Sequence, residues 1–224
     1  MSQTYPGRQD LTVLCWTTPQ NHAGYLSRIV VFQLNDRGAA KPLWESPIED
    51  SYSPQIRFLP EITVRGLPLA AVERQTGAAS SKLDIIGMTA GRITRLNRID
   101  GNTLEIAKLD GSKLPFVIAH RDANILDVPR IYRWSGVRFV EDSDAHRDYY
   151  RELFDADRAK LSKDASGAVL VNLARIAVLA GKTPTAKQIL RDALSRERGK
   201  GDAADPLTVR LLANELRTLA GKPQ

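Results

Sequence analysis

The chain has 224 residues, of which 42% are hydrophobic and 26% charged, values typical of a folded globular protein and not of a disordered one. Its net charge of +6 is spread evenly, since residues 1–141 carry 17 basic and 14 acidic side chains and residues 142–224 carry 15 and 12. Nucleic-acid-binding proteins usually concentrate their basic charge on one stripe or tail. We therefore expect no nucleic-acid partner.

Cysteine content and hydropathy exclude further classes. Cys15 is the single cysteine, which rules out an intrachain disulfide and a cysteine-based zinc site. No apolar run is long enough for a transmembrane helix, so we expect no membrane span. The first residues lack a charged segment followed by an apolar one, so a signal peptide is not expected. Composition alone leaves the compartment open.

Short apolar runs separated by Gly, Pro, Asn and Asp dominate the first 140 residues, and this pattern predicts strands joined by turns. Leu104 and Ile106 alternate with Glu105 and Ala107, as in a half-buried strand. The predicted strands are 11–17, 26–34, 42–45, 55–59, 67–75, 82–88, 92–96, 103–109, 115–120, 130–134 and 137–141.

These strands repeat with a period of about 45 to 50 residues, which is the spacing of four-stranded β-propeller blades. The second strand of two successive units opens with Leu-Pro, at residues 67–68 and 114–115. A short Gly turn, at Gly91 and Gly136, follows the third strand. The earliest unit lacks a first strand, so the sequence predicts about two and three-quarter units. An irregular β-sandwich is the alternative.

After Glu141 the composition changes to Ala, Leu, Arg, Lys and Asp at helical spacing. We expect a first helix capped by Ser143 or Asp144 and running to about Lys160. Three more helices are predicted over 162–180, 183–196 and 207–219. The predicted fold class is therefore α+β, with a β-blade domain over 1–141 and a bundle of about four helices over 142–224.

The segment Asp127-Val-Pro-Arg-Ile-Tyr-Arg-Trp-Ser-Gly-Val-Arg-Phe-Val-Glu141 resembles the blade ending of bacterial FG-GAP/VCBS-like propeller proteins. The resemblance extends over residues 11–141. It implies an exported or periplasmic protein that acts in adhesion or ligand binding. Calcium-binding members carry several Asp residues in the turn between the first two strands of a blade. Here the turn Asp110-Gly-Ser-Lys-Leu-Pro115 offers one carboxylate and a Lys, so calcium is not expected.

Residues 169–195 resemble a single tetratricopeptide-type helical hairpin, with Ala174, Gly181, Ala186, Leu190 and Ala193 at the small and apolar positions where two helices approach closely. A solenoid with a binding groove needs about three such repeats. One hairpin implies a helical brace for a neighbouring domain.

Two short segments partly match sequence motifs of nucleotide-binding enzymes. His120-Arg121-Asp122 matches the start of a kinase catalytic loop, but Asn124 follows too early and no Gly-rich loop or Asp-Phe-Gly accompanies it. Gly181-Lys182-Thr183 matches the end of a phosphate-binding loop, but Ile176 stands where the first glycine is required. We interpret the first as a turn and the second as a helix boundary.

The sequence predicts no catalytic, cofactor-binding or metal-ligating residue and no cofactor. His22, His120 and His146 are the only histidines, and no Gly-x-Ser-x-Gly elbow is present. Trp44 stands between Pro42 and Pro47 and is the candidate ligand-contact aromatic.

We therefore expect a non-enzymatic binding or scaffolding protein that uses the loops and edges of its blades. Fewer than three blades cannot close a ring, so a protein partner or a homodimer is expected to cover the open edges. The alternative is a hydrolase acting on a carbohydrate or peptide in a cleft between the β and helical parts.

Overall fold

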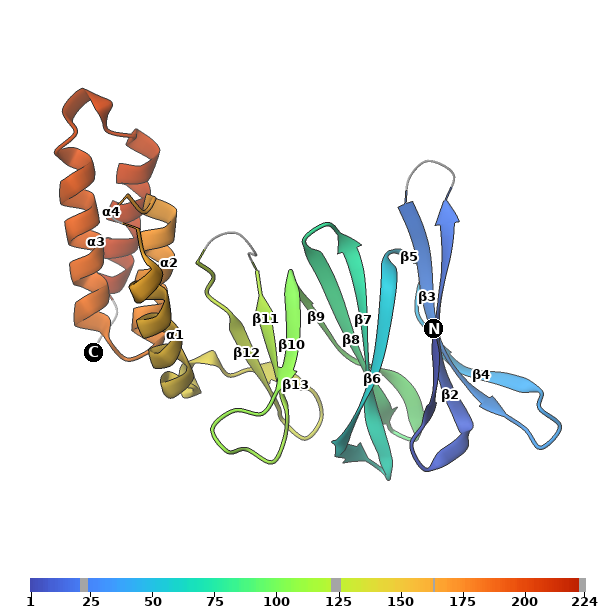
Figure 1. Ribbon diagram of the computed structural model, residues 1–224. Helices are drawn as coiled ribbons and strands as arrows, with labels where there is room; N and C mark the ends of the chain where they lie inside the picture. Colours follow the sequence, from blue (N-terminus) through green and yellow to red (C-terminus); the bar gives the residue numbers. More distant parts are fainter. Residues whose placement is uncertain (21–23, 122–125, 163, 222–224) are drawn as a thin grey trace. The chain divides into compact units, whose positions relative to one another are not determined.

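The computed structural model describes residues 1–20, 24–121, 126–162 and 164–221 (Figure 1). In this part the protein is α+β: three antiparallel sheets of four or five strands precede four α-helices. The chain divides into two compact units. The β unit comprises Met1–Arg121 and Ile131–Glu141, and the helical unit comprises residues 126–130 and 142–221 of the described part.

The first sheet contains β1 (Ser2–Tyr5), β2 (Arg8–Gln20), β3 (Gly24–Leu34) and β4 (Ala40–Glu45) in that order, and β5 (Glu49–Asp50) also pairs with β3. The prediction that this unit lacks a first strand was wrong, because β1 pairs antiparallel with β2. Ser2–Tyr5 is short and mostly polar, so it gives no periodic signal. The backbone amide of Cys15 on β2 donates to the carbonyl oxygen of Met1 at 2.8 Å. Pairing with β2, and not a local sequence pattern, therefore holds this short strand in place.

The second and third sheets have four strands each, and neighbouring strands follow the order of the sequence. The described part therefore holds three antiparallel sheets, one of five strands and two of four. The second sheet is β6 (Tyr52–Val64), β7 (Leu67–Gly77), β8 (Ser80–Thr89) and β9 (Arg92–Gly101). The third is β10 (Thr103–Ala107), β11 (Phe116–His120), β12 (Arg130–Trp134) and β13 (Phe139–Glu141).

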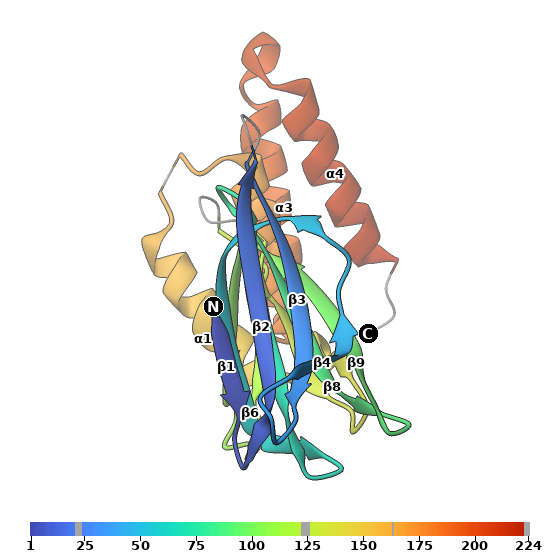
Figure 2. The same ribbon diagram turned by 90° about the vertical axis from the view of Figure 1, so that its right-hand side faces the viewer.

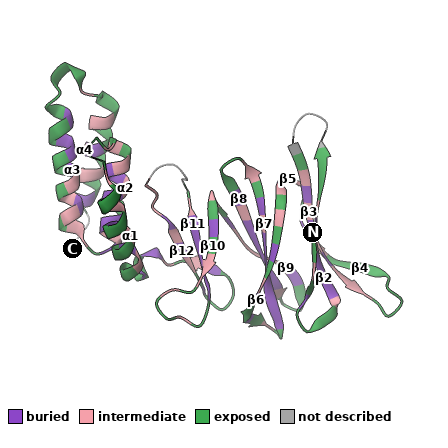
Figure 3. Ribbon diagram, viewed as in Figure 1, coloured by how far each residue is buried: buried purple, intermediate pink, exposed green. Residues whose placement is uncertain are grey.

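Two apolar cores hold the three sheets together, and Figure 3 shows the buried residues along the central strands. The second sheet contributes to both. Ala70 and Val72 of β7 belong to the core shared with the first sheet, whereas Leu69 and Ala71 belong to the core shared with the third. This alternation follows from the two-residue period of a strand. Near-continuous apolar runs such as Leu67–Val72 therefore mark a sheet covered on both faces.

The first sheet is covered on one face only. Val13, Cys15, Ile29 and Val31 face the second sheet and are fully buried. The alternate residues lie on the opposite face, which we call the outer face (Figure 2). Its half-buried apolar side chains include Leu14, Trp16, Val30 and Phe32.

The helical unit contains α1 (Arg147–Lys160), α2 (Gly167–Leu179), α3 (Thr183–Arg198) and α4 (Pro206–Ala220). The prediction that the first helix starts from a Ser143 or Asp144 cap was wrong. Ser143–Ala145 forms a separate 3₁₀ turn, and α1 begins after His146 without a side-chain cap. A further 3₁₀ turn, Gly201–Ala203, lies in the loop before α4.

Small residues at the helix contacts let the helices of this unit approach closely. Ala174 and Ala177 of α2 and Ala186 of α3 are completely buried. The phenolic hydroxyl of Tyr150 in α1 donates to the carbonyl oxygen of Pro129 at 2.7 Å. The side-chain amide of Asn172 in α2 donates to the carbonyl oxygen of Leu126 at 2.8 Å. These bonds fasten residues 126–130 to the helices. None of the helices in the described ranges is long and apolar enough to cross a membrane.

Candidate ligand-binding site

Trp44 lies on β4 opposite Val31 of β3, and its half-buried side chain packs against the core between the first two sheets. The pairing shifts at this point, since Phe32 pairs with Pro42 and leaves Leu43 as an extra residue on β4. Regular alternation would send Leu43 and Trp44 to opposite faces of the sheet. The bulge instead lets both side chains line one cavity.

That cavity has a volume of about 550 Å³ and lies between the first and second sheets. Its size falls within the range of about 300–1,000 Å³ that is usual for small-molecule sites. The exposed residues Leu43, Gly91 and Arg92 in its lining show that it opens to solvent. Its walls are mainly apolar, formed by Leu11, Leu43, Trp44, Leu67, Met88 and Ile93.

The polar side chains of the cavity are Arg8, Gln33 and Arg92. Arg8 is already paired, because its Nε and Nη2 each donate to a carboxylate oxygen of Asp10 at 2.8 Å. Gln33 Nε2 also donates to Asp10, at 2.7 Å. The hydrogen bonds from Arg8 and then from Gln33 hold the pKa of Asp10 well below its ordinary value. Arg8 and Asp10 are therefore a neutralised pair at one side of the cavity.

A buried ionic cluster also lies on the face that the second sheet turns toward the first. Arg74 and Asp84 are both fully buried, and Arg74 Nη2 lies 2.5 Å from Asp84 Oδ2. Arg74 Nη1 donates to Ser27 Oγ on β3 at 2.9 Å. Arg98 joins the cluster through Asp84, at 3.0 Å, and through Glu49 on β5, at 2.8 Å. The cluster therefore ties the first sheet to the second through charge.

The ionisation of this cluster determines its chemistry. Burial alone would raise the pKa of Glu49, but its hydrogen bond with Arg98 and the positive charges around it lower the pKa overall. A general acid needs a carboxyl whose pKa is raised toward neutrality. The pKa of Glu49 is shifted in the opposite direction, so its carboxylate stays ionised and compensates the positive charge of the arginines around it. The hydrolase alternative stays a prediction with no geometric support from this cluster.

The two histidines of the described residues, His120 and His146, do not line the cavity or belong to the ionic cluster. His146 is buried in the helical unit and His120 ends β11 in the β unit. His22, Asp122 and Asn124 lie outside the described residues. In the ranges that the structure describes, no three His, Cys, Asp or Glu side chains are grouped so that they could hold a metal ion.

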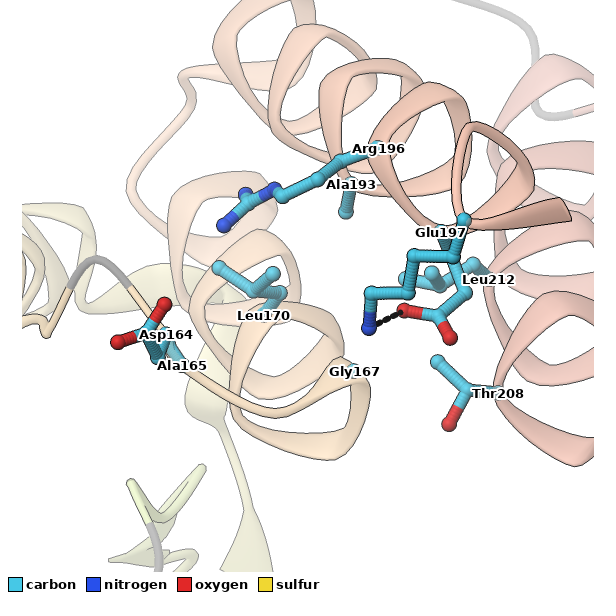
Figure 4. A pocket seen from close by; sticks show the side chains of 10 residues that line it. Asp164, Ala165, Gly167, Leu170, Ala193, Arg196, Glu197, Thr208 and Leu212 are labelled. Atoms are coloured by element: carbon cyan, nitrogen blue, oxygen red, sulfur yellow. Dashed lines mark hydrogen bonds and ion pairs between the residues drawn. The ribbon is translucent and has the colours of Figure 1, made fainter. Parts of the chain in front are cut away.

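The helical unit has a smaller cavity of about 130 Å³, bordered by α2, α3 and α4 (Figure 4). Glu197 and Lys200 form an ion pair of 2.7 Å beside it, and Glu197 also accepts a hydrogen bond from the backbone amide of Asp205 at 2.9 Å. A Cβ on Gly167 would lie 2.5 Å from Thr208, so α2 and α4 are already in tight contact here. These polar groups hold the loop before α4, and the space is too small for a typical ligand.

No family model, curated protein or solved structure matched this chain. The resemblances to FG-GAP/VCBS-like propellers and to a tetratricopeptide hairpin therefore stay predictions. The sequence predicts Trp44 as a ligand-contact aromatic but gives no sign of the cavity beside it. The bulge at Leu43 and the close approach of β4 to the turn at Gly91 depend on pairing between distant segments, for which the sequence contains no local signal.

Proposed function

We propose that the protein is a non-enzymatic binding protein whose β unit takes up a small apolar ligand between its first two sheets. The observation that carries this proposal is the cavity of about 550 Å³ with Trp44 in its wall. An apolar cavity of this size leaves the side chains around it without packing partners. A ligand that fills it would recover those contacts, and the indole of Trp44 would supply a broad contact surface.

The proposal is tested by titrating the full chain with octanol, a neutral apolar probe, while following tryptophan fluorescence and heat. We expect saturable binding and a change in emission. Trp44→Phe should remove most of the emission change, whereas Trp16→Phe, on the outer face, should leave it in place. Octanol that binds without affecting Trp44, or does not bind, would contradict the proposal.

A variant that blocks the cavity separates it from other apolar surfaces. Leu43 is 38% exposed and lines the cavity, while Ile48 is 47% exposed and does not line it. Leu43→Glu places a charge in the apolar wall and should abolish octanol binding. Ile48→Glu adds the same charge elsewhere and should bind normally. Because both positions are exposed, both variants should remain folded.

The second part of the proposal concerns partners: a second copy of the chain covers the outer face of the first sheet. Leu14, Trp16, Val30 and Phe32 form an apolar surface there, whereas the second sheet has both faces covered. Arg28 and Glu45 lie on the same face and form an ion pair of 2.6 Å. A two-fold axis would place each apolar face on its equivalent and bring opposite charges together across the interface.

The strand edge beside this face is a weaker interaction surface than the sequence suggested. The edge strand β4 carries Lys41 and Pro42 and is interrupted by the bulge at Leu43, all of which discourage strand addition. Size-exclusion chromatography with light scattering should show a dimer at micromolar concentration. Phe32→Glu should give a monomer and Ile48→Glu should not. A wild-type chain that is monomeric throughout would contradict this part.

A further inference from the structure

One side of the cavity carries a positive charge that the protein itself does not compensate. Arg8 is neutralised by Asp10, as described above. Arg92 also lines the cavity, is exposed, and forms no hydrogen bond or ion pair through its side chain with any other described residue. Since it comes directly after Gly91 at the start of β9, its backbone is fixed by the sheet while its guanidinium remains available.

A second arginine, Arg65, lies close to Gly91 in the neighbouring hairpin. The turns β6–β7 and β8–β9 lie at the same end of the second sheet, and in each the two central residues have positive φ: 52° and 78° at Arg65 and Gly66, and 47° and 76° at Ala90 and Gly91. Arg65 Nη1 lies 3.6 Å from the position that a Cβ would occupy on Gly91. Among the described residues, no carboxylate pairs with Arg65 either. The Arg92 guanidinium therefore belongs to the cavity lining, and the Arg65 guanidinium lies beside Gly91, a residue of that lining.

We infer that the cavity binds an amphipathic anion: an elongated apolar molecule whose end carries a carboxylate or phosphate held by Arg92 and Arg65. This inference rests on the proposed function and names its ligand class. The apolar walls around Trp44 accept the tail but offer no partner to a charge. The planar guanidinium fork matches carboxylate and phosphate oxygens and is less strongly hydrated than an ammonium group. Residues at the rim can therefore bind the head group while the tail lies inside.

The test compares four ligands with the same tail: octanoate, octyl phosphate, octanol and octylamine, each titrated into the full chain below its micelle-forming concentration. We expect one or both anions to bind at least about tenfold more tightly than octanol, as hydrogen bonds to charged groups require. The tighter of the two identifies the head group. Added salt should weaken anion binding and leave octanol binding nearly unchanged.

Matched variants assign the effect to the two arginines. Arg92→Gln should lower anion affinity to about that of octanol, and Arg65→Gln should lower it by a smaller factor, with octanol affinity unchanged in both. Arg37→Gln, at an exposed turn away from the cavity lining, is the control and should bind like the wild type.

The outcomes separate the two proposals. Equal binding of anion and alcohol, or preference for octylamine, would overturn the amphipathic-anion inference while leaving the apolar site intact. Loss of octanol binding in Arg92→Gln would also overturn it, because the arginine would then be shaping the cavity. If octanol does not bind, the proposed function itself fails.

Discussion

The two units of this protein stabilise their interiors in different ways. In the helical unit, small buried residues such as Ala177 bring the helices together, and the described cavity there measures only about 130 Å³. In the β unit, the face between the first two sheets combines a buried ionic cluster around Arg74 and Asp84 with an apolar cavity of about 550 Å³. Among the cavities of the described residues, the one of ligand size lies between sheets and not between helices.

The reason lies in the geometry of the two kinds of contact. Alanines let helices approach until their backbones nearly touch, which leaves little space. Twisted sheets diverge at their corners, and side chains must fill the gap that results. The ionic cluster closes one part of the gap with charges, whereas the part beside Trp44 and Gly91 stays open. A variant that disrupts the ionic cluster should therefore lower the stability of the β unit. A variant that crowds the buried alanines should lower the stability of the helical unit.

The three tryptophans, Trp16, Trp44 and Trp134, all belong to the β unit, so their fluorescence reports its unfolding. Far-ultraviolet circular dichroism responds strongly to the helices. Two probes thus follow the two units separately, and the predictions below are ordered by the size of the effect expected.

The largest effect is expected for Asp84→Ala. It leaves the fully buried Arg74 without its main counter-charge, which should lower the free energy of unfolding of the β unit by about 3–5 kcal/mol. Urea denaturation followed by tryptophan fluorescence measures this. Asp100→Ala, at an exposed position on β9, should change stability by no more than about 0.5 kcal/mol. A similar small change for Asp84→Ala would show that the cluster does not stabilise the sheets.

Ala177→Leu tests the close packing of the helical unit. Ala177 is completely buried on α2, and added methylene groups there should destabilise the unit by about 1–3 kcal/mol. The far-ultraviolet signal should melt earlier while tryptophan fluorescence keeps its midpoint. Ala156→Leu, on the exposed surface of α1, makes the same change without crowding. A shift of both signals together would mean that the two units unfold as one.

Ser166→Ala removes the cap of α2, where Ser166 Oγ accepts a hydrogen bond from the backbone amide of Val169 at 3.4 Å. Because this bond is long, the expected loss is near the lower end of the range for caps, about 0.5–1 kcal/mol. Thermal denaturation of the helical signal measures it. Ser195→Ala, within α3, provides the control, and equal effects of the two variants would argue against a capping role.

The smallest effect is the pH dependence that Glu49 contributes to the β unit. Its pKa is lowered in the folded state, so its stabilisation is complete above the ordinary glutamate pKa of about 4.3 and is lost as the pH falls through the lower folded value. The stability difference between wild type and Glu49→Gln should therefore shrink between about pH 4 and pH 2. A constant difference across this window would contradict the ion-pair role.

The sequence by itself determined the order of elements in this protein. Alternation in 103–107 and turn residues such as Gly91 marked the strands, and helical periodicity after Glu141 marked the change of unit. These signals are local, since a strand or helix displays its buried face in consecutive residues. Two exceptions were local too: Ser2–Tyr5 is too short and polar to show a period, and Ser143 begins a 3₁₀ turn instead of capping a helix.

The tertiary structure alone formed the cavity that we propose as the ligand site. The sequence distinguished Trp44 by its neighbouring prolines, but nothing in it placed Gly91, Arg92 and Arg65 near the same cavity. Likewise, nothing in the sequence marks Arg74 and Asp84 as buried; the pairing of β7 with β8 and the packing of their sheet against the first sheet bury them. Burial and uncompensated charge arise from contacts between residues far apart in the chain, and only the packed sheets define them.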